Sequence, residues 1–262
     1  MKKISSLLLG FVFTCFLLAG SVNAQTSSKI PYPFGYDTKS AGASSAENVG
    51  DYKRSPYFKH PDFYNMKSGG SLLLLEKFKT YQQTTEWSCG NAVAVMVLQH
   101  FGNKDFDELS IARIMGTNPL PEDGNMQEGV LYGTTTAGMA RFFDEAGYEV
   151  QSSLQSPEGT TFKHPDEFKK WVQSHLQNNI PIMVDWLDWS GHWQIIIGYD
   201  TMGTDTLYDD VLIFADPYDV GDQLQDGYYI FPMLRFYYMW QDFQYQPEGH
   251  KVQQWLIATP KK

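Results

Sequence analysis

The sequence contains very little cysteine. Only two of its 262 residues are cysteines, at positions 15 and 89. Cys15 lies in an apolar N-terminal segment, so loss of that segment would leave Cys89 as the one thiol and would exclude a disulfide within the chain. No set of cysteine and histidine residues has the spacing of a zinc site. We therefore expect neither a metal nor another cofactor.

Positive charge is also scarce. The chain has 20 Lys and Arg residues against 30 Asp and Glu residues, a formal net charge of −10. An acidic surface disfavours nucleic acids and anionic lipids as partners. A glycine-rich loop of the GxxxxGK[ST] type does not occur, so the sequence has no ATPase motif.

Long apolar runs are confined to the N-terminus. Two lysines precede the apolar block Leu7 to Leu18, and Val22-Asn23-Ala24 forms a plausible cleavage site. The block is shorter than the roughly 20 residues that span a bilayer, and the pattern is typical of a secretory signal peptide. We expect residues 1–24 to be removed and the mature chain to be exported, periplasmic or secreted. Lipidation at Cys15 is the alternative, although the residues before it form a poor lipobox.

The rest of the chain divides into an arm and a domain. Residues 25–70 are rich in Ser, Gly, Pro, Tyr and Lys and lack helical or strand periodicity, which predicts an extended N-terminal arm, either loose or laid across the domain. A removable pro-segment is the alternative, although no processing point is evident. One folded domain is expected over residues 71–262.

Within the domain, apolar periodicity predicts helices first and strands later, an α+β order rather than alternating βαβ units. Helices are predicted at Gly90–Phe101, Phe106–Met115, Thr135–Ala146 and Asp166–Asn178. Strands are predicted at Tyr148–Ser153, Ile180–Trp186, Trp193–Tyr199, Val211–Ala215, Gly227–Phe231 and Val252–Thr259.

Cys89 stands directly before the first predicted helix. That helix is apolar on most sides, so we expect it to be buried in the middle of the domain. A thiol at this position faces the positive end of the helix dipole, which favours the thiolate. Two interpretations follow: a catalytic nucleophile, or a small buried side chain without chemistry.

A nucleophilic thiol needs a base within hydrogen-bond reach. Of the six histidines, His100 lies too far along the cysteine helix. His164 and His175 are expected on the surface of another helix, and His60 and His250 lie in polar irregular segments. His192 differs, because it follows Gly191 and opens an apolar strand. A strand holds an imidazole rigidly, so His192 is the candidate base, with a structural histidine at the strand mouth as the alternative.

Hairpin geometry predicts an acid next to His192. The two strands that follow this residue are expected to pair antiparallel about a turn near residue 204. In that register Asp216 lies opposite His192, and Asp200 lies about 26 Å away at the far end of the strand. A bulge could move the register by one or two residues, so Asp219 is a second candidate. An aspartate beside the ring would fix its tautomer and stabilise the imidazolium.

Acyl transfer also needs a hydrogen-bond donor for the developing oxyanion. Gln83 lies six residues before Cys89, on the segment that leads into the helix. Its side-chain amide can point to the same place as the backbone N–H of Cys89, whereas alternation turns the side chain of Gln82 away. Gln83 is therefore the candidate oxyanion donor.

Four segments in this order resemble the double-glycine bacteriocin-leader peptidases, family 39 of the cysteine peptidases, in the papain-like clan. They are YQQTTEWSCGNAVAVMVLQHFG, GTTTAGMARFFDEAGY, PIMVDWLDWSGHWQIIIGYD and FADPYD, within about residues 79–220. The resemblance implies a papain-like fold, with the cysteine on a central helix and the histidine and aspartate on an antiparallel sheet. It also implies that Cys89 is the nucleophile, His192 the general base and acid, Asp216 the residue that orients the ring and Gln83 the oxyanion donor.

The chain also departs from this family. Its leader peptidases are usually the front domain of an ATP-driven exporter that faces the cytosol, whereas this chain has no ATPase motif and a predicted signal peptide. Processing at a double glycine is therefore not implied. We expect an exported cysteine peptidase or amidase with a peptide or protein substrate. The alternatives are an acyl or γ-glutamyl transferase on the same triad, as in the related phytochelatin synthases, and a papain-like binding module without turnover. The oligomeric state is open.

Two segments carry weaker signals. An acidic run lacks the EF-hand pattern, so a solvated loop is favoured over a calcium site; its members are Asp216, Asp219, Asp222 and Asp226. The aromatic tail from Tyr228 to Tyr245 favours core packing, with a groove for peptide as the alternative.

Overall fold

The computed structural model describes residues 30–37, 41–46, 61–121, 123–156, 160–188, 190–221 and 224–262. The predicted signal peptide and parts of the arm lie outside these ranges. The α-helices are α1 (Cys89–His100), α2 (Glu108–Met115), α3 (Thr136–Glu145), α4 (Pro165–Gln177) and α5 (Met233–Met239). The strands are β1 (Leu72–Leu74), β2 (Tyr148–Ser152), β3 (Ile182–Leu187), β4 (Gly191–Asp200), β5 (Val211–Ala215), β6 (Tyr228–Pro232) and β7 (Gln254–Pro260). Two 3-10 helices are η1 (Gly42–Ala46) and η3 (Ser153–Gln155).

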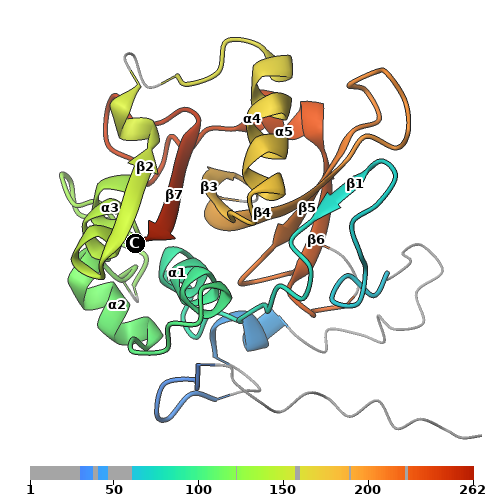
Figure 1. The fold of residues 1–262 in the computed structure, drawn as a ribbon. Coiled ribbons are helices and arrows are strands. Elements are labelled where there is room, and N and C mark those ends of the chain that lie inside the picture. Colours follow the sequence, from blue (N-terminus) through green and yellow to red (C-terminus); the bar gives the residue numbers. More distant parts are fainter. Residues whose placement is uncertain are drawn as a thin grey trace, which may run out of the picture.

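A seven-stranded antiparallel sheet is the framework of the domain (Figure 1). Its order is β2-β7-β3-β4-β5-β6, and β1 pairs with the end of β4. The α+β prediction is confirmed, and the ends of the predicted helices and strands differ from the observed ones by two residues at most. The sequence did not predict β1 or α5, which lie in apolar segments without a clear period.

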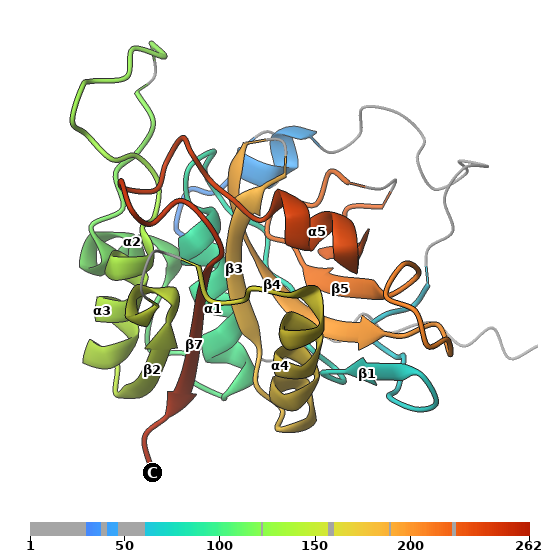
Figure 2. The ribbon, with the colours of Figure 1, turned by 90° about the horizontal axis from the view of Figure 1, so that it is seen from above.

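Helix α1 lies in the middle of the molecule, between the sheet and helices α2 and α3 (Figures 1 and 2). Every residue from Gly90 to Leu98 is buried, as its apolar sides predict. Thr134 packs directly against the first turn, where a Cβ at Gly90 would lie 2.6 Å from the Thr134 Cβ. The absence of a side chain at Gly90 therefore lets the Thr134 loop lie next to Cys89.

Described parts of the N-terminal arm pack against the domain. The backbone N–H of Ile30 donates to Oε1 of Gln99 on α1 at 3.2 Å. Nearer the start of α1, the N–H of Ala43 donates to the carbonyl of Gln83 at 3.0 Å. Gly42 adopts a positive φ of 54°, and a Cβ there would lie 2.4 Å from the same carbonyl oxygen. Of the two expected arrangements, these residues adopt the packed one.

A buried carboxylate supports the segment that leads to Cys89. Glu108 begins α2 and accepts hydrogen bonds from the Tyr81 hydroxyl at 3.1 Å and the Thr84 backbone N–H at 3.0 Å. Burial raises the pKa of Glu108, an effect that hydrogen bonds from Ser88, Thr84 and Tyr81 oppose. Helix α2 thus fixes the position of the chain just before the nucleophile candidate.

The aromatic tail packs one of its sides in the core and exposes the other. Met233, Phe236 and Trp240 are buried, which confirms the favoured interpretation for this part. Further along, Asp242 and Tyr245 line a pocket. The tail therefore contributes both to the core and to the wall of a pocket.

Candidate active site

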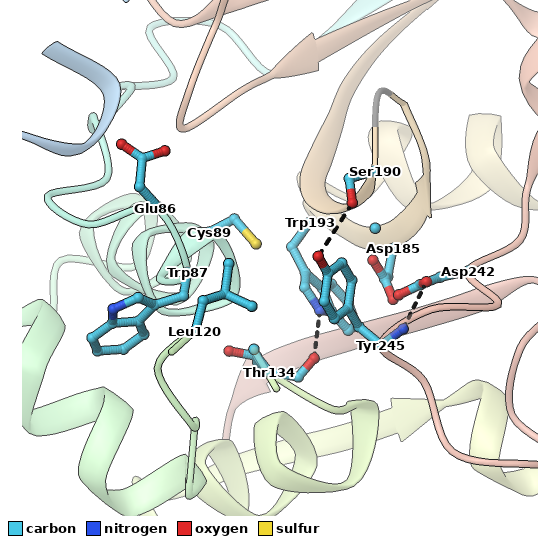
Figure 3. Close-up of a pocket in the computed structure, with 12 residues that line it drawn as sticks. Glu86, Trp87, Cys89, Leu120, Thr134, Asp185, Ser190, Trp193, Asp242 and Tyr245 are labelled. Atoms are coloured by element: carbon cyan, nitrogen blue, oxygen red, sulfur yellow. Dashed lines mark hydrogen bonds between the residues drawn. The ribbon is translucent and has the colours of Figure 1, made fainter. Parts of the chain in front are cut away.

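Cys89 is the first residue of α1, and its sulfur points into a pocket (Figure 3). The thiol is half-buried and is not part of a disulfide. The pocket is lined by Glu86, Trp87, Cys89, Leu120, Gly133, Thr134, Asp185, Ser190, Gly191, Trp193, Asp242 and Tyr245. Access from a pocket favours the nucleophile interpretation over that of an inert packed thiol.

His192 and Asp216 form a buried hydrogen-bonded pair. Nε2 of His192 lies 2.8 Å from Oδ1 of Asp216, and the two residues are 2% and 3% exposed. Asp216 also accepts hydrogen bonds from Nε2 of Gln194 at 2.8 Å and from the backbone N–H of Tyr218 at 2.9 Å. Both carboxylate oxygens are therefore held, which fixes the orientation of the imidazole.

The imidazole also contacts the thiol. Since Nε2 is bound to Asp216, Nδ1 is the ring nitrogen left for Cys89. Burial lowers the pKa of His192, but the charge and hydrogen bond of Asp216 and then those of Cys89 outweigh it, so this pKa lies well above its ordinary value. Burial raises the pKa of Asp216, but the charge and hydrogen bond of His192 hold it below its ordinary value. The site thus favours an imidazolium beside a carboxylate.

The register of β4 and β5 differs from the predicted one. Ala215 pairs with Ile195, so the continued register places Asp216 opposite Gln194 and not opposite His192, a difference of two residues. Pairing begins at Asp200 and Val211, so the connection is centred about one residue later than expected, and a bulge lies between Ile196 and Gly198. Asp216 reaches His192 diagonally across the strands.

The other acidic candidates lie elsewhere. Asp219 accepts a hydrogen bond from the backbone N–H of Gly227 at 2.6 Å. Asp200 lies at the far end of β4, as predicted. Asp216 and Asp219 are buried, so the prediction of a solvated acidic loop is wrong for these two residues, because each carboxylate is used in a hydrogen bond. Asp222 lies outside the described residues.

Gln83 lies beside the turn that holds Asp216. Its backbone N–H donates to the carbonyl of Pro217 at 2.8 Å. The side chain is buried, and Nε2 donates to the carbonyl of Thr85 at 2.7 Å. Oε1 has no hydrogen-bond partner among the described residues, and Gln83 does not line the pocket of Cys89. The structure therefore brings Gln83 near the candidate residues, with one amide N–H turned to the backbone.

Gln194 also belongs to the site and was not predicted. Its Oε1 accepts a hydrogen bond from Nε1 of Trp186 at 2.7 Å, and its Nε2 holds Asp216. Residues 192 and 194 share one face of β4, so the two-residue period of a strand could have identified it.

None of the described histidines lines the pocket, and His192 lies between its lining residues Gly191 and Trp193 in the chain. His100 contacts the carbonyl of Asn179 at 3.0 Å, and His175 contacts that of Trp171 at 2.7 Å. His164 precedes the first residue of α4, and His60 lies outside the described residues.

Within the described ranges, no three His, Cys, Asp or Glu side chains are grouped as metal ligands. None of the helices in those ranges has the length and hydropathy needed to cross a bilayer.

Residues 75–248 match the model of the Peptidase C39 like family. The chain belongs to this family. It is thus a cysteine peptidase with a papain-like fold, and the matched range includes Cys89, His192 and Asp216. A comparison with curated proteins finds no match.

Two solved structures to which this C39-like peptidase is similar are ComA peptidase domains. One is from Streptococcus ComA, a bi-functional ABC transporter involved in a quorum-sensing pathway, with 17% sequence identity and a TM-score of 0.41. The other is from Streptococcus mutans ComA, with 16% identity and a TM-score of 0.34. Each comparison covers 70% of this chain and 99% of the other.

Proposed function

We propose that this peptidase is exported and hydrolyses peptide or amide bonds with Cys89 as nucleophile, His192 as general base and acid, and Asp216 as the orienting residue. One observation supports this most. A half-buried thiol at a helix start faces a pocket and is a hydrogen-bond partner of an imidazole that a buried carboxylate holds at 2.8 Å. In acyl transfer of this kind, the base contacts the nucleophile and the orienting acid contacts the base, as these three residues do.

The first half of the reaction forms a thioester. Nδ1 of His192 takes the proton of Cys89, the sulfur attacks the substrate carbonyl carbon, and the C=O electron pair moves to oxygen. The tetrahedral intermediate collapses, the C–N bond breaks, and His192 gives its proton to the leaving amine. The acyl group remains on the sulfur.

The second half releases the acid. Water loses a proton to His192 and attacks the thioester carbon, the C–S bond breaks, and the proton returns to the sulfur. Asp216 stays ionised throughout, because His192 holds the pKa of this carboxyl below its usual range. Its charge stabilises the imidazolium in both halves.

Gln83 and the backbone N–H of Cys89 are the proposed donors to the oxyanion. The hydrogen bond from the Gln83 backbone to Pro217 at 2.8 Å supports this role, because it fixes Gln83 next to the Asp216 turn. One N–H of its amide donates to Thr85, so donation to the oxyanion uses the second N–H or follows release of the first.

Export is proposed from the first 24 residues alone, which lie outside the described ranges. N-terminal sequencing of protein recovered from outside the cytoplasm tests it. A mature chain that begins at Gln25 supports export through a signal peptide. A lipid-modified start at Cys15 would favour the lipoprotein alternative, and an intact Met1 would contradict cleavage.

Digestion of a proteome-derived peptide library tests the activity without knowledge of the substrate. The wild-type protein should create new N-termini, and Cys89→Ala should create none. Cleavage that persists in Cys89→Ala would contradict the proposed nucleophile. Adding glycinamide to the same digest separates hydrolysis from transfer, because a transferase would leave glycinamide on the new C-termini.

A further inference from the structure

Two carboxylates line the pocket of Cys89 and have no part in the proposed reaction. Asp185 comes from β3, Asp242 follows α5, and each is 1% exposed. Figure 3 shows their carboxyl groups facing each other, on the side of the pocket opposite Cys89. Buried acids in a pocket are costly unless something compensates their charge.

The two carboxyl groups are hydrogen-bond partners of each other. Burial, followed by the negative charges of Asp242 and Cys89, raises the pKa of Asp185 well above its ordinary value, and a hydrogen bond from Gln246 opposes this. Two carboxylates in contact do not both stay ionised unless a cation lies between them. Without a cation, the two groups share one proton. The pair therefore holds a proton that a cation can replace.

Backbone and side-chain donors fix the pair in place. Oδ1 of Asp242 accepts hydrogen bonds from the backbone N–H groups of Gln244 at 2.8 Å and Tyr245 at 3.0 Å. Oδ2 of Asp185 accepts one from Nε2 of Gln246 at 2.6 Å. Oδ2 of Asp242 is buried, and no N–H or hydroxyl group of the described residues donates to it. The proton shared with Asp185 is the donor left for this oxygen, and a donor from a ligand can take its place.

Gly191 provides the room for this arrangement. A Cβ at Gly191 would lie 2.3 Å from Oδ2 of Asp242 and 2.5 Å from Cδ2 of Tyr245. The residue directly before His192 thus makes space for a carboxylate and an aromatic ring. The acidic pair is thereby built into the strand that carries the candidate base.

The rest of the pocket suits a cation. None of its described lining residues is lysine, arginine or histidine, and a third carboxylate, that of Glu86, lies exposed at the rim. Trp193 and Tyr245 offer aromatic rings, which attract cations. The volume of about 60 Å³ corresponds to about two water molecules, enough for the charged end of one side chain.

We propose that Asp185 and Asp242 bind a positively charged group of the substrate next to the bond that Cys89 attacks. The group is an ammonium or guanidinium, from a lysine or arginine side chain or from a free α-amine. It would replace the shared proton and donate to Oδ2 of Asp242. This specificity rests on the proposed function, since it concerns the same pocket.

Thiol reagents of different charge test the proposal. Cys89 is modified with 2-aminoethyl methanethiosulfonate, which is cationic, and with methyl methanethiosulfonate, which is neutral. The ratio of the two rates, referred to glutathione as a reference thiol, reports the preference for a cation. Asp242→Asn keeps the size of the side chain and its acceptor for Gln244 and Tyr245. We expect it to lower the ratio at least about fivefold, because one ionised carboxylate instead of two then faces the cation that has replaced the proton.

Two further variants keep the result interpretable. Asp185→Asn should lower the ratio by a similar factor, and circular dichroism melting verifies that both variants are folded. Glu86→Gln is the matched control, because its carboxylate lines the same pocket but is exposed, and we expect less than about a twofold change. A ratio that neither Asp185→Asn nor Asp242→Asn changes would overturn the proposal.

Small protectants identify the source of the charge. N-acetyl-lysine amide, N-acetyl-arginine amide and alanine amide are compared with neutral N-acetyl-norleucine amide for protection of Cys89 from methyl methanethiosulfonate. Better protection by a capped basic residue identifies a side chain, and better protection by alanine amide identifies a free α-amine. Equal protection by all four would contradict the site. These protection measurements need no turnover. Failure of the proposed peptidase reaction is measured in a separate experiment, the library digestion, as cleavage that persists in Cys89→Ala.

Discussion

Nε2 of His192 lies 2.8 Å from Oδ1 of Asp216, which leaves Nδ1 of the same ring for the sulfur of Cys89. The orientation is held twice, because Gln194 binds the second oxygen of Asp216 and is itself bound by Trp186. Within a cysteine peptidase fold, the imidazole of His192 thus contacts the thiol of Cys89 on one side and the carboxylate of Asp216 on the other.

Asp216→Asn should reduce kcat/KM at least about tenfold. The charge of Asp216 raises the pKa of His192, so the protonated ring that the leaving amine needs persists to higher pH in the wild type. Without that charge the alkaline limb of the kcat/KM profile should move to lower pH. The matched control is Asp219→Asn, whose carboxylate binds the N–H of Gly227. If Asp219→Asn moves the limb and Asp216→Asn does not, the assignment of Asp216 is wrong.

Gln83→Ala should lower kcat by about 10²- to 10³-fold, the usual effect of losing an oxyanion donor. The rate of alkylation of Cys89 by iodoacetamide should stay unchanged, since alkylation develops no oxyanion. Gln82→Ala is the control, because alternation along the chain turns the side chain of Gln82 away from the site to which Gln83 points. Equal kcat values for Gln83→Ala and the wild type would remove Gln83 from the mechanism.

Gly191→Ala should disturb the acidic pair more than the fold. Its Cβ would lie 2.3 Å from Oδ2 of Asp242, so the carboxylate or Tyr245 must move, at a cost of about 1–3 kcal/mol in the free energy of unfolding. We expect the preference of Cys89 for the cationic reagent to fall as well. Ser190→Ala tests whether any change in this wall of the pocket has this effect, because Ser190 lines the pocket and contacts the Tyr245 hydroxyl but neither carboxylate; we expect it to keep the preference.

Glu108→Ala should lower the free energy of unfolding by about 2–4 kcal/mol, because it leaves the Tyr81 hydroxyl and the Thr84 N–H without their acceptor. Glu108→Gln should lose less, since one oxygen acceptor remains.

The pKa of Glu108 is raised in the folded state, so protonation favours folding and the wild type loses stability as pH rises above about 4.5. Glu108→Gln lacks this dependence. Denaturant unfolding at several pH values measures it, and parallel curves for the two proteins would contradict the burial of this carboxylate.

Much of the fold follows from local patterns in the sequence. The apolar sides of α1 predict a central buried helix, and the start of β4 predicts a rigid histidine. Pairing of β4 with β5 predicts that Asp216 lies near His192, and the contact is present although the register differs by two residues. The observed pairs centre the hairpin about one residue later than the turn residues suggest, and turn residues alone do not fix that centre, so the register could not be exact.

The wall of the pocket could not be predicted in this way. Asp185 and Asp242 lie on separate elements, and only the packing of the tail after α5 against β3 and β4 brings them together. Each aspartate alone looks like an ordinary polar residue in the sequence. Gln194 is intermediate, since strand alternation places it beside His192 but does not show what it binds.

The central claim is that His192 activates Cys89. Its most direct test is the rate at which iodoacetamide modifies Cys89 in the native protein as a function of pH, compared between the wild type and His192→Ala. We predict rapid modification of the wild type at neutral pH and a rate at least about tenfold lower in His192→Ala. Modification that requires denaturation, or equal rates in the two proteins, would contradict the claim.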